Sequence, residues 1–399
     1  RRQFNSVEGD PFNPREIRES AERIRALGFF STAEVNAREG STPNQVIVDV
    51  DVEEQPTGSL SFGASFSTND GIGFAIQFRE RNFLGRGQNV GISLSTAADD
   101  QLYRFDFTEP AFLGRDVAFG LRLDISENNS STVTYDTETG LISPSLTFPV
   151  GINSRLGLNY KYEQSEMKDR GSSSQSGPII LRDIDEGERV NSSIGYRYTY
   201  DTRRTGLDPT SGYLFEFGQD FAGIGGDNTF IKTTARVAGE RKIFNEDVTL
   251  RASVEGGALS FQSGVNRATD RFLLRSDILR GFEPGGIGPR DLTETDEDPL
   301  GGNLFVAARF EAEFPLGLPE EYGITGGVFY DIGNLWNLDD VDLSGGNVVG
   351  ESGSLRHVIG ISVLWDTPIG PLRFNFSDAV KKEDFDRTQN FEVTVSTTF

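Results

Sequence analysis

The stretch LYRFDFTEP, residues 102–110, alternates between two kinds of side chain with a period of two. Tyr103 and Phe105 fall on one face of an extended chain, whereas Arg104 and Asp106 fall on the other. Successive side chains of a β-strand point to opposite faces. The stretch therefore predicts a strand with one aromatic face and one charged face.

The same alternation recurs from Gly58 almost to the last residue. It is clear in LSFGASF (60–66), VAFGLRLDI (117–125), SIGYRYTYD (193–201) and FEVTVSTTF (391–399). A soluble β-sandwich also has strands of this kind. Here, however, charged residues occupy the second face of strand after strand, and an apolar outside with a polar inside is typical of a membrane-spanning β-barrel. The sequence therefore predicts an all-β transmembrane fold over residues 58–399.

The connections between the strands support a barrel because they alternate in length. Short ones include ERNFLGRGQ (80–88) and FPVGINS (148–154). The long polar ones are predicted at about 127–140, 163–187, 259–301, 333–354 and 378–389. Counting gives about sixteen strands, eleven before the longest loop and five after it, at about 21 residues per strand and connection, which suits tilted spanning strands. An even number returns both ends of the barrel to the side of the short turns.

Residues 1–57 have a different texture, which predicts part of a small α+β domain. Asn13 is a candidate N-cap, Pro14 suits the first helical turn and Gly28 suits the helix end. Apolar residues at helical spacing are Ile17, Ala21, Ile24 and Leu27. The alternating positions of a following strand, of which we expect one face to be buried, are Val46, Val48, Val50 and Val52.

Composition excludes several function classes. The formal net charge of −23 argues against nucleic acid as a partner. Cysteine is absent and His357 is the only histidine, so thiolate and histidine-rich metal sites are excluded, and we expect no metal, cofactor or catalytic residue. The acidic stretch TETDEDPL (293–300) lacks the spacing of a calcium loop and is predicted to be solvated.

One further stretch, LRGFEPGGIGPR (279–290), places Arg280 in a loop with four glycines. Strand periodicity predicts that Glu311 and Asp331 point into the lumen, so an arginine folded inward would meet carboxylates. Gly281 would allow the tight bend, and Phe282 could anchor it. On composition alone, a solvated surface loop is an equal alternative.

Taken together, these features resemble the BamA family of outer-membrane protein assembly factors. The resemblance covers the whole chain: the end of a periplasmic POTRA-type domain (1–57), a sixteen-stranded barrel with a re-entrant loop at about 259–301, and a terminal aromatic residue. Its most specific marker is Arg280-Gly281-Phe282, although Leu279 replaces the usual Val or Ile. In the family, acids at the positions of Glu311 and Asp331 meet the loop arginine inside the barrel.

The resemblance implies a non-enzymatic insertase of the Gram-negative outer membrane. Its first and last strands would form a lateral gate, and Leu60 would lie close enough to Val395 for an engineered disulfide. The gate residues that this implies are Leu60, Phe62, Phe391, Val393, Val395 and Phe399. The implied partners are unfolded outer-membrane proteins, accessory lipoproteins, lipid and lipopolysaccharide, with no cofactor.

Three alternatives stay open at this point. A secretion transporter of the same superfamily, of the two-partner or the translocation-and-assembly type, also carries the loop motif and would differ in its POTRA domains. A passive porin would need an open lumen. An outer-membrane hydrolase would need a nucleophile and a base, which the sequence does not supply.

Overall fold

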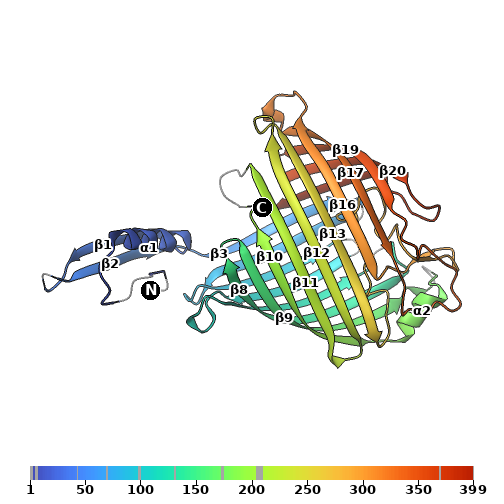
Figure 1. Cartoon of the computed structure of the whole chain (residues 1–399), viewed down its shortest axis with the longest axis horizontal. Helices are drawn as coiled ribbons and strands as arrows, with labels where there is room; N and C mark the ends of the chain where they lie inside the picture. The colour runs from blue at the N-terminus through green and yellow to red at the C-terminus, as the bar shows by residue number, and fades with distance from the viewer. Residues whose placement is uncertain are drawn as a thin grey trace.

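The structure is a computed structural model, and it has a small N-terminal unit joined to a large barrel (Figure 1). It describes residues 3–4, 8–42, 44–68, 71–97, 100–129, 132–171, 175–203, 210–367 and 370–398. No helix among these residues is long and apolar enough to cross a membrane.

The N-terminal unit consists of helix α1 (Pro14–Ala26) and a hairpin of β1 (Phe30–Glu39) and β2 (Val46–Glu54). The Asn13 side chain accepts a hydrogen bond from the Arg15 backbone N–H at 3.1 Å, which caps the helix. Ala21 and Ile24 of α1 and Ala33 of β1 are buried together. The predicted helix and strand are therefore both present.

The expected burial of one face of β2 is wrong for most of that strand. Val46, Val50 and Val52 keep 44%, 40% and 44% of their surface exposed. The reason is geometric, because among the described residues α1 packs on β1, and β2 lies beyond the cover of the helix.

The barrel is closed and antiparallel, and its sixteen strands confirm the predicted fold class and strand count. The strands are β3 (Gly58–Ser67), β4 (Gly71–Phe83), β5 (Gln88–Thr96), β6 (Asp100–Glu109), β7 (Ala118–Asn128), β8 (Tyr135–Gly151), β9 (Ser154–Asp169), β10 (Arg189–Asp201), β11 (Ser211–Gly226), β12 (Thr229–Ile243), β13 (Val248–Ser263), β16 (Leu304–Pro315), β17 (Ile324–Trp336), β19 (Arg356–Thr367), β20 (Gly370–Lys381) and β21 (Phe391–Thr398). Closure occurs where β21 pairs with β3.

The register places the two kinds of side chain on opposite faces of the wall. Between β6 and β7, Phe105 lies opposite Leu123 on the outer face, while Asp106 lies opposite Arg122 on the inner face. Arg122 and Asp106 form an ion pair at 3.0 Å. Large apolar side chains stay exposed on the outside, including Phe74 at 59%. Apolar exposure of this kind fits a surface that faces lipid.

The lengths of the connections match the predicted alternation of short and long only in part. Residues predicted as a loop at 127–140 are mostly strand, because β7 and β8 form a long hairpin whose polar residues lie on both faces. Connections 68–70, 97–99 and 227–228 on the same side are also short. Four long connections remain, namely L4 (170–188), L6 (264–303), L7 (337–355) and L8 (382–390).

L4, L6 and L7 pack together beyond the strands. L4 contains helix α2 (Pro178–Asp185), and a small sheet joins β14 (Arg290–Asp291) and β15 (Asp298–Pro299) of L6 to β18 (Val348–Val349) of L7. The buried apolar cluster that joins the loops includes Ile179, Ile180, Leu300 and Leu338. Figure 1 shows α2 at the end of the barrel away from the N-terminal unit.

This packing corrects the prediction of a solvated acidic loop at 293–300 for its last three residues, 298–300, whereas the residues before them are exposed or half-buried. Asp298 and Leu300 are 1% and 0% exposed. The Asp298 carboxylate accepts a hydrogen bond from the Gly177 N–H at 2.5 Å, before α2, and another from the Thr134 hydroxyl. Burial raises the pKa of Asp298 above its usual range.

Spin labels can check which face of the wall meets lipid. We expect labels at Phe105 and Leu121 to report an apolar, oxygen-accessible environment, because both point outward. Labels at Asp106 and Arg122 should report water in the lumen, and one at Arg18, exposed on α1, serves as the aqueous reference. Equal polarity for both sets on the barrel would contradict the assignment of its faces.

Candidate functional site: an arginine lock inside the barrel

Loop L6 folds back against the inner wall of the barrel instead of extending into solvent. Leu279, Arg280 and Phe282 are 2%, 1% and 2% exposed. Between them, Gly281 has φ +85°, and a Cβ there would meet Val358 Cγ1 at 2.7 Å. Only glycine fits both the left-handed backbone and this close approach.

The Arg280 guanidinium binds two carboxylates at once. Its Nε and Nη2 donate to the two oxygens of Asp331, each at 2.7 Å, and Nη1 donates to Glu311 Oε2 at 2.5 Å. Two parallel hydrogen bonds between one guanidinium and one carboxylate make a strong and directional contact. The Arg280 Cζ also lies 3.7 Å from the centre of the Phe329 ring. We call these four residues the arginine lock.

The barrel register brings the two acids together. Glu311 of β16 lies opposite Phe329 of β17, and Asp331 lies opposite Arg309, so the two carboxylates are diagonal neighbours on the inner face. Their side chains are 9% and 0% exposed. Burial alone would lower the pKa of Arg280, but its hydrogen bonds and charge interactions with Asp331 and Glu311 outweigh that effect and raise the pKa.

Sequence reasoning missed two further arginines in the network. Arg373 of β20 donates to Glu311, and Arg251 of β13 lies 3.5 Å from the same carboxylate. Glu311 is therefore shared among three cations. The alternation in LRFNFS (372–377) indicates that Arg373 points inward, but no motif marks it as a partner of L6.

L6 is also fixed to L8 through its backbone. Phe282 forms a bridge with Thr388, the Gln389 N–H donates to the Gly281 carbonyl at 3.0 Å, and the Glu283 N–H donates to the Arg387 carbonyl at 3.1 Å. The Phe282 side chain packs in an apolar cluster whose other buried members are Leu274, Leu279, Ile287, Phe305, Phe329, Leu335 and Val358. The bend is thus held by charge, backbone and apolar contacts.

The last strand pairs over a shorter length than its neighbours. In the described residues, the register of β21 with β3 comprises five pairs, from Thr394–Ser67 to Thr398–Gly63, and that with β20 also comprises five. The neighbouring pairing of β3 with β4 comprises ten. We call the junction of β21 and β3 the seam.

The seam register corrects one expected contact. Val395 lies opposite Phe66, and Leu60 lies six residues farther along β3. Leu60 and Phe62 instead pair with Phe78 and Ile76 of β4. The residue-by-residue register of two antiparallel strands, which alternation alone does not fix, decides this distance.

The remaining predicted seam residues lie on β21. Phe391 and Val393 lie opposite Phe376 and Phe374 of β20. Phe399 falls outside the described residues.

The chemistry of the arginine lock is that of an anchor. The guanidinium donors of Arg280 are used in hydrogen bonds to the carboxylates of Glu311 and Asp331. No nucleophile with an adjacent base is part of the lock. In the described part of the chain, no group of three or more potential metal ligands is present. The arrangement can hold L6 in one position and can connect that position to the surrounding strands.

Two known protein families match most of the chain. Residues 82–399 match the family described as Omp85 superfamily domain, and residues 1–55 match the POTRA family described as surface antigen variable number repeat.

Individual relatives agree with the family match. The chain is 27% identical to the outer membrane protein assembly factor BamA of Neorickettsia risticii (strain Illinois), over 100% of this chain and 53% of that protein. It is 24% identical to the BamA of Neisseria meningitidis serogroup B, over 100% of this chain and 54% of that protein. The chain thus spans about half the length of these curated relatives.

Solved structures share the fold. BamA from Haemophilus ducreyi lacking POTRA domains 1–3 superposes with a TM-score of 0.85 at 22% identity, covering 100% of this chain and 81% of that one. CdiB from Acinetobacter baumannii gives a TM-score of 0.61 at 9% identity, covering 100% and 70%. These likenesses concern the fold.

Removing the Arg280 side chain should destabilise the barrel strongly. Arg280→Ala removes the two forked hydrogen bonds to the fully buried Asp331 carboxylate and leaves it, among the described cations, only the Arg309 guanidinium, 3.9 Å away; breaking a buried pair of this kind costs about 3–5 kcal/mol. Denaturant unfolding in detergent measures the loss, with Trp336 at the end of β17 as a fluorescent reporter. Arg122→Ala, which breaks the exposed pair with Asp106, is the control and should cost about 1 kcal/mol or less.

A double-mutant cycle tests whether the lock is one unit. Arg280→Ala combined with Asp331→Asn should cost clearly less than the sum of the two single changes, because both remove the same contact. Strict additivity would mean that the two residues act separately.

Proposed function

The chain belongs to the Omp85 superfamily, and from this membership we propose that it is the barrel-bearing part of an assembly factor that folds and inserts β-barrel proteins into the outer membrane. The barrel lies in the outer membrane, and the segment before Gly58 lies in the periplasm. The structural observation that carries the proposal is the short pairing on both edges of β21.

A seam of this kind suits strand insertion. If β21 and β3 part, each exposes a row of backbone N–H and C=O groups toward the lipid. In hydrocarbon, these groups must find partners, and an incoming strand can supply them. The client would add a strand to the open edge, and burial of its apolar outer face in lipid would drive the step. No energy source, cofactor or catalytic residue is required.

Loop L6 is connected to the seam strand through a chain of polar contacts. The Ser276 hydroxyl of L6 donates to Glu392 Oε1 of β21 at 2.6 Å, and Asn375 Nδ2 donates to Glu392 Oε2 at 3.2 Å. Asn375 Oδ1 in turn accepts from Arg373 Nε at 3.0 Å. Since Arg373 also binds Glu311, the arginine lock and the last strand share one network. We infer that the position of L6 biases whether the seam is paired.

Of the rival functions, the passive porin is less well supported. A passive porin needs lumen space, part of which the buried loop L6 occupies along the inner wall. A secretion transporter of the same superfamily shares the fold, and the fold alone does not separate it from an insertase. The proposed clients are unfolded outer-membrane proteins. Accessory lipoproteins and lipopolysaccharide stay predictions.

A disulfide across the seam tests the lateral gate. The Thr68 N–H donates to the Val393 carbonyl, so the next pair, Ser67 with Thr394, is a non-hydrogen-bonded pair whose side chains lie close enough to be bridged. The chain has no cysteine of its own. We expect oxidised Ser67→Cys/Thr394→Cys protein in proteoliposomes to lose client folding, measured by heat-dependent gel mobility, and to regain it on reduction.

The control for the seam disulfide is Ala75→Cys/Ser95→Cys, which bridges β4 and β5 at a junction that is not expected to open. Full client folding with the seam oxidised would rule out a lateral gate. Loss of folding with the control bridge would show that general rigidity matters instead.

The arginine lock can be tested by the same assay. Arg280→Ala should expose L6 to protease and slow client folding, because the loop loses its buried anchor. Arg280→Lys should restore only part of both properties, since an ammonium group cannot make the two-pronged contact with Asp331. Arg122→Ala should leave both unchanged. An Arg280→Ala protein with a protease-sensitive L6 but undiminished folding of clients would separate the lock from function.

A further inference from the structure

An apolar groove crosses the outer face of the barrel and is separated from the seam by β19, β20 and β21. It has a volume of about 600 Å³ and runs over β11, β12, β13, β16 and β17. One register row explains it: Tyr213 lies opposite Gly239, Gly239 opposite Ala252, and Ala252 opposite Phe310. Gly239 and Ala252, which lack large side chains, therefore lie between the rings of Tyr213 and Phe310, which form the two walls of the groove.

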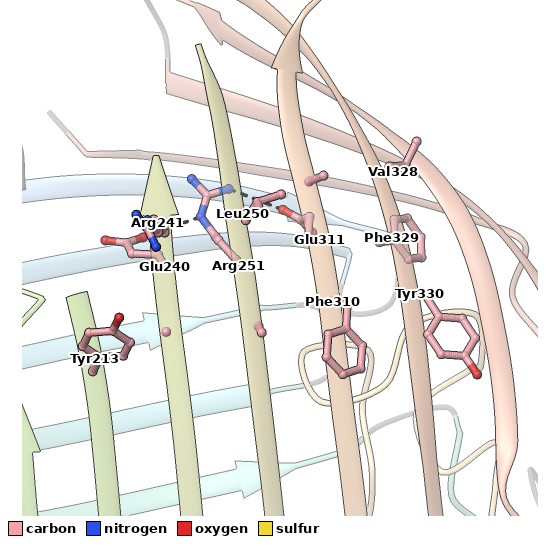
Figure 2. Close-up of a pocket in the computed structure, with 13 residues that line it drawn as sticks. Tyr213, Glu240, Arg241, Leu250, Arg251, Phe310, Glu311, Val328, Phe329 and Tyr330 are labelled. Carbon is pink, nitrogen blue, oxygen red and sulfur yellow. Dashed lines mark ion pairs between the residues drawn. The ribbon is translucent and has the colours of Figure 1, made fainter. Parts of the chain in front are cut away.

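The groove faces lipid. Tyr213 and Phe310 are 59% and 46% exposed, and they alternate along their strands with the inward residues of the wall, such as Glu311. Figure 2 shows Tyr213, Phe310 and Tyr330 in a row across the strands, with Arg241 displaced from that row toward the end of β12.

Arg241 stands at the periplasmic end of the groove. It lies two residues beyond Gly239 on the same face of β12, opposite Leu250, and β12 ends at Ile243 in one of the short turns. Its neighbour Glu240 points to the other face, where it lies 3.7 Å from Arg251. In the part of the chain that the structure describes, no carboxylate lies within ion-pair distance of Arg241.

An exposed cation on the lipid-facing surface attracts anions, and none of the described residues supplies one to Arg241. At the periplasmic boundary of the membrane, the available anions are lipid phosphates, which a guanidinium binds as a fork. Tyr213 beside it is the type of residue that marks the membrane interface. The groove is also within the volume range of ligand sites.

We propose that this groove binds one glycerophospholipid of the periplasmic leaflet. The lipid phosphate contacts the Arg241 guanidinium, and an acyl chain lies over Gly239 and Ala252 between Tyr213 and Phe310. The proposal depends on the membrane-embedded barrel and is independent of whether the seam opens.

Native mass spectrometry of the whole chain in detergent tests the proposal with dioleoylphosphatidylglycerol as the probe. We expect one lipid to be retained and Arg241→Gln to weaken its binding about tenfold, because a charge-assisted contact is lost. Ala252→Leu should also weaken binding, since it fills the floor of the groove. Dioleoylglycerol, which has the same chains without the phosphate, should bind wild type and Arg241→Gln equally weakly.

The control is Arg86→Gln, an exposed arginine in the 84–87 turn at the same end of the barrel. It should bind the lipid as wild type does, and heat-dependent gel mobility should show that every variant is folded. Unchanged binding by Arg241→Gln, or an equal loss in Arg86→Gln, would overturn the site. Retention of detergent alone, or displacement of the lipid by millimolar inorganic phosphate, would overturn the lipid as its occupant.

Discussion

Backbone groups that face hydrocarbon must be hydrogen-bonded within the protein, and this constraint shapes the whole molecule. It closes the sheet into a barrel and leaves the junction of β21 with β3 as the place where closure is completed. Both edges of β21 pair over a short length. Among the described residues, the strand whose two edges would cost the fewest hydrogen bonds to open is therefore β21, and in lipid such an opening would demand a new strand.

The charged residues of the lumen are connected to the same junction of β21 with β3. Glu311 is held by Arg280 from L6 and by Arg373 from the wall, and the network continues through Asn375 to Glu392 on the last strand. In a low-dielectric interior, each of these groups is costly to leave unpaired. A displacement of L6 therefore has consequences at β21, which gives the proposed assembly function a physical link between the loop and the seam.

The wall that carries the arginine lock has an inner and an outer face in different environments. Glu311 points inward to Arg280, while Phe310 and Ala312, on either side of it along β16, face outward beside the groove. Strand alternation allows one segment to serve both environments, because successive side chains never compete for the same space. The proposed lipid site and the lock are thus separated by the thickness of one strand.

The sequence by itself determined the barrel, its strand number and the faces of residues such as Phe105 and Asp106, because period-two alternation directly reports which side meets lipid. Together with the family resemblance, it also indicated the partners of Arg280. Tertiary structure alone decided that Asp298 is buried beneath α2, that Arg373 shares Glu311, and that Val395 faces Phe66. These facts depend on register and on loops packing across long sequence separations, and local alternation is the same for every register that differs by two residues.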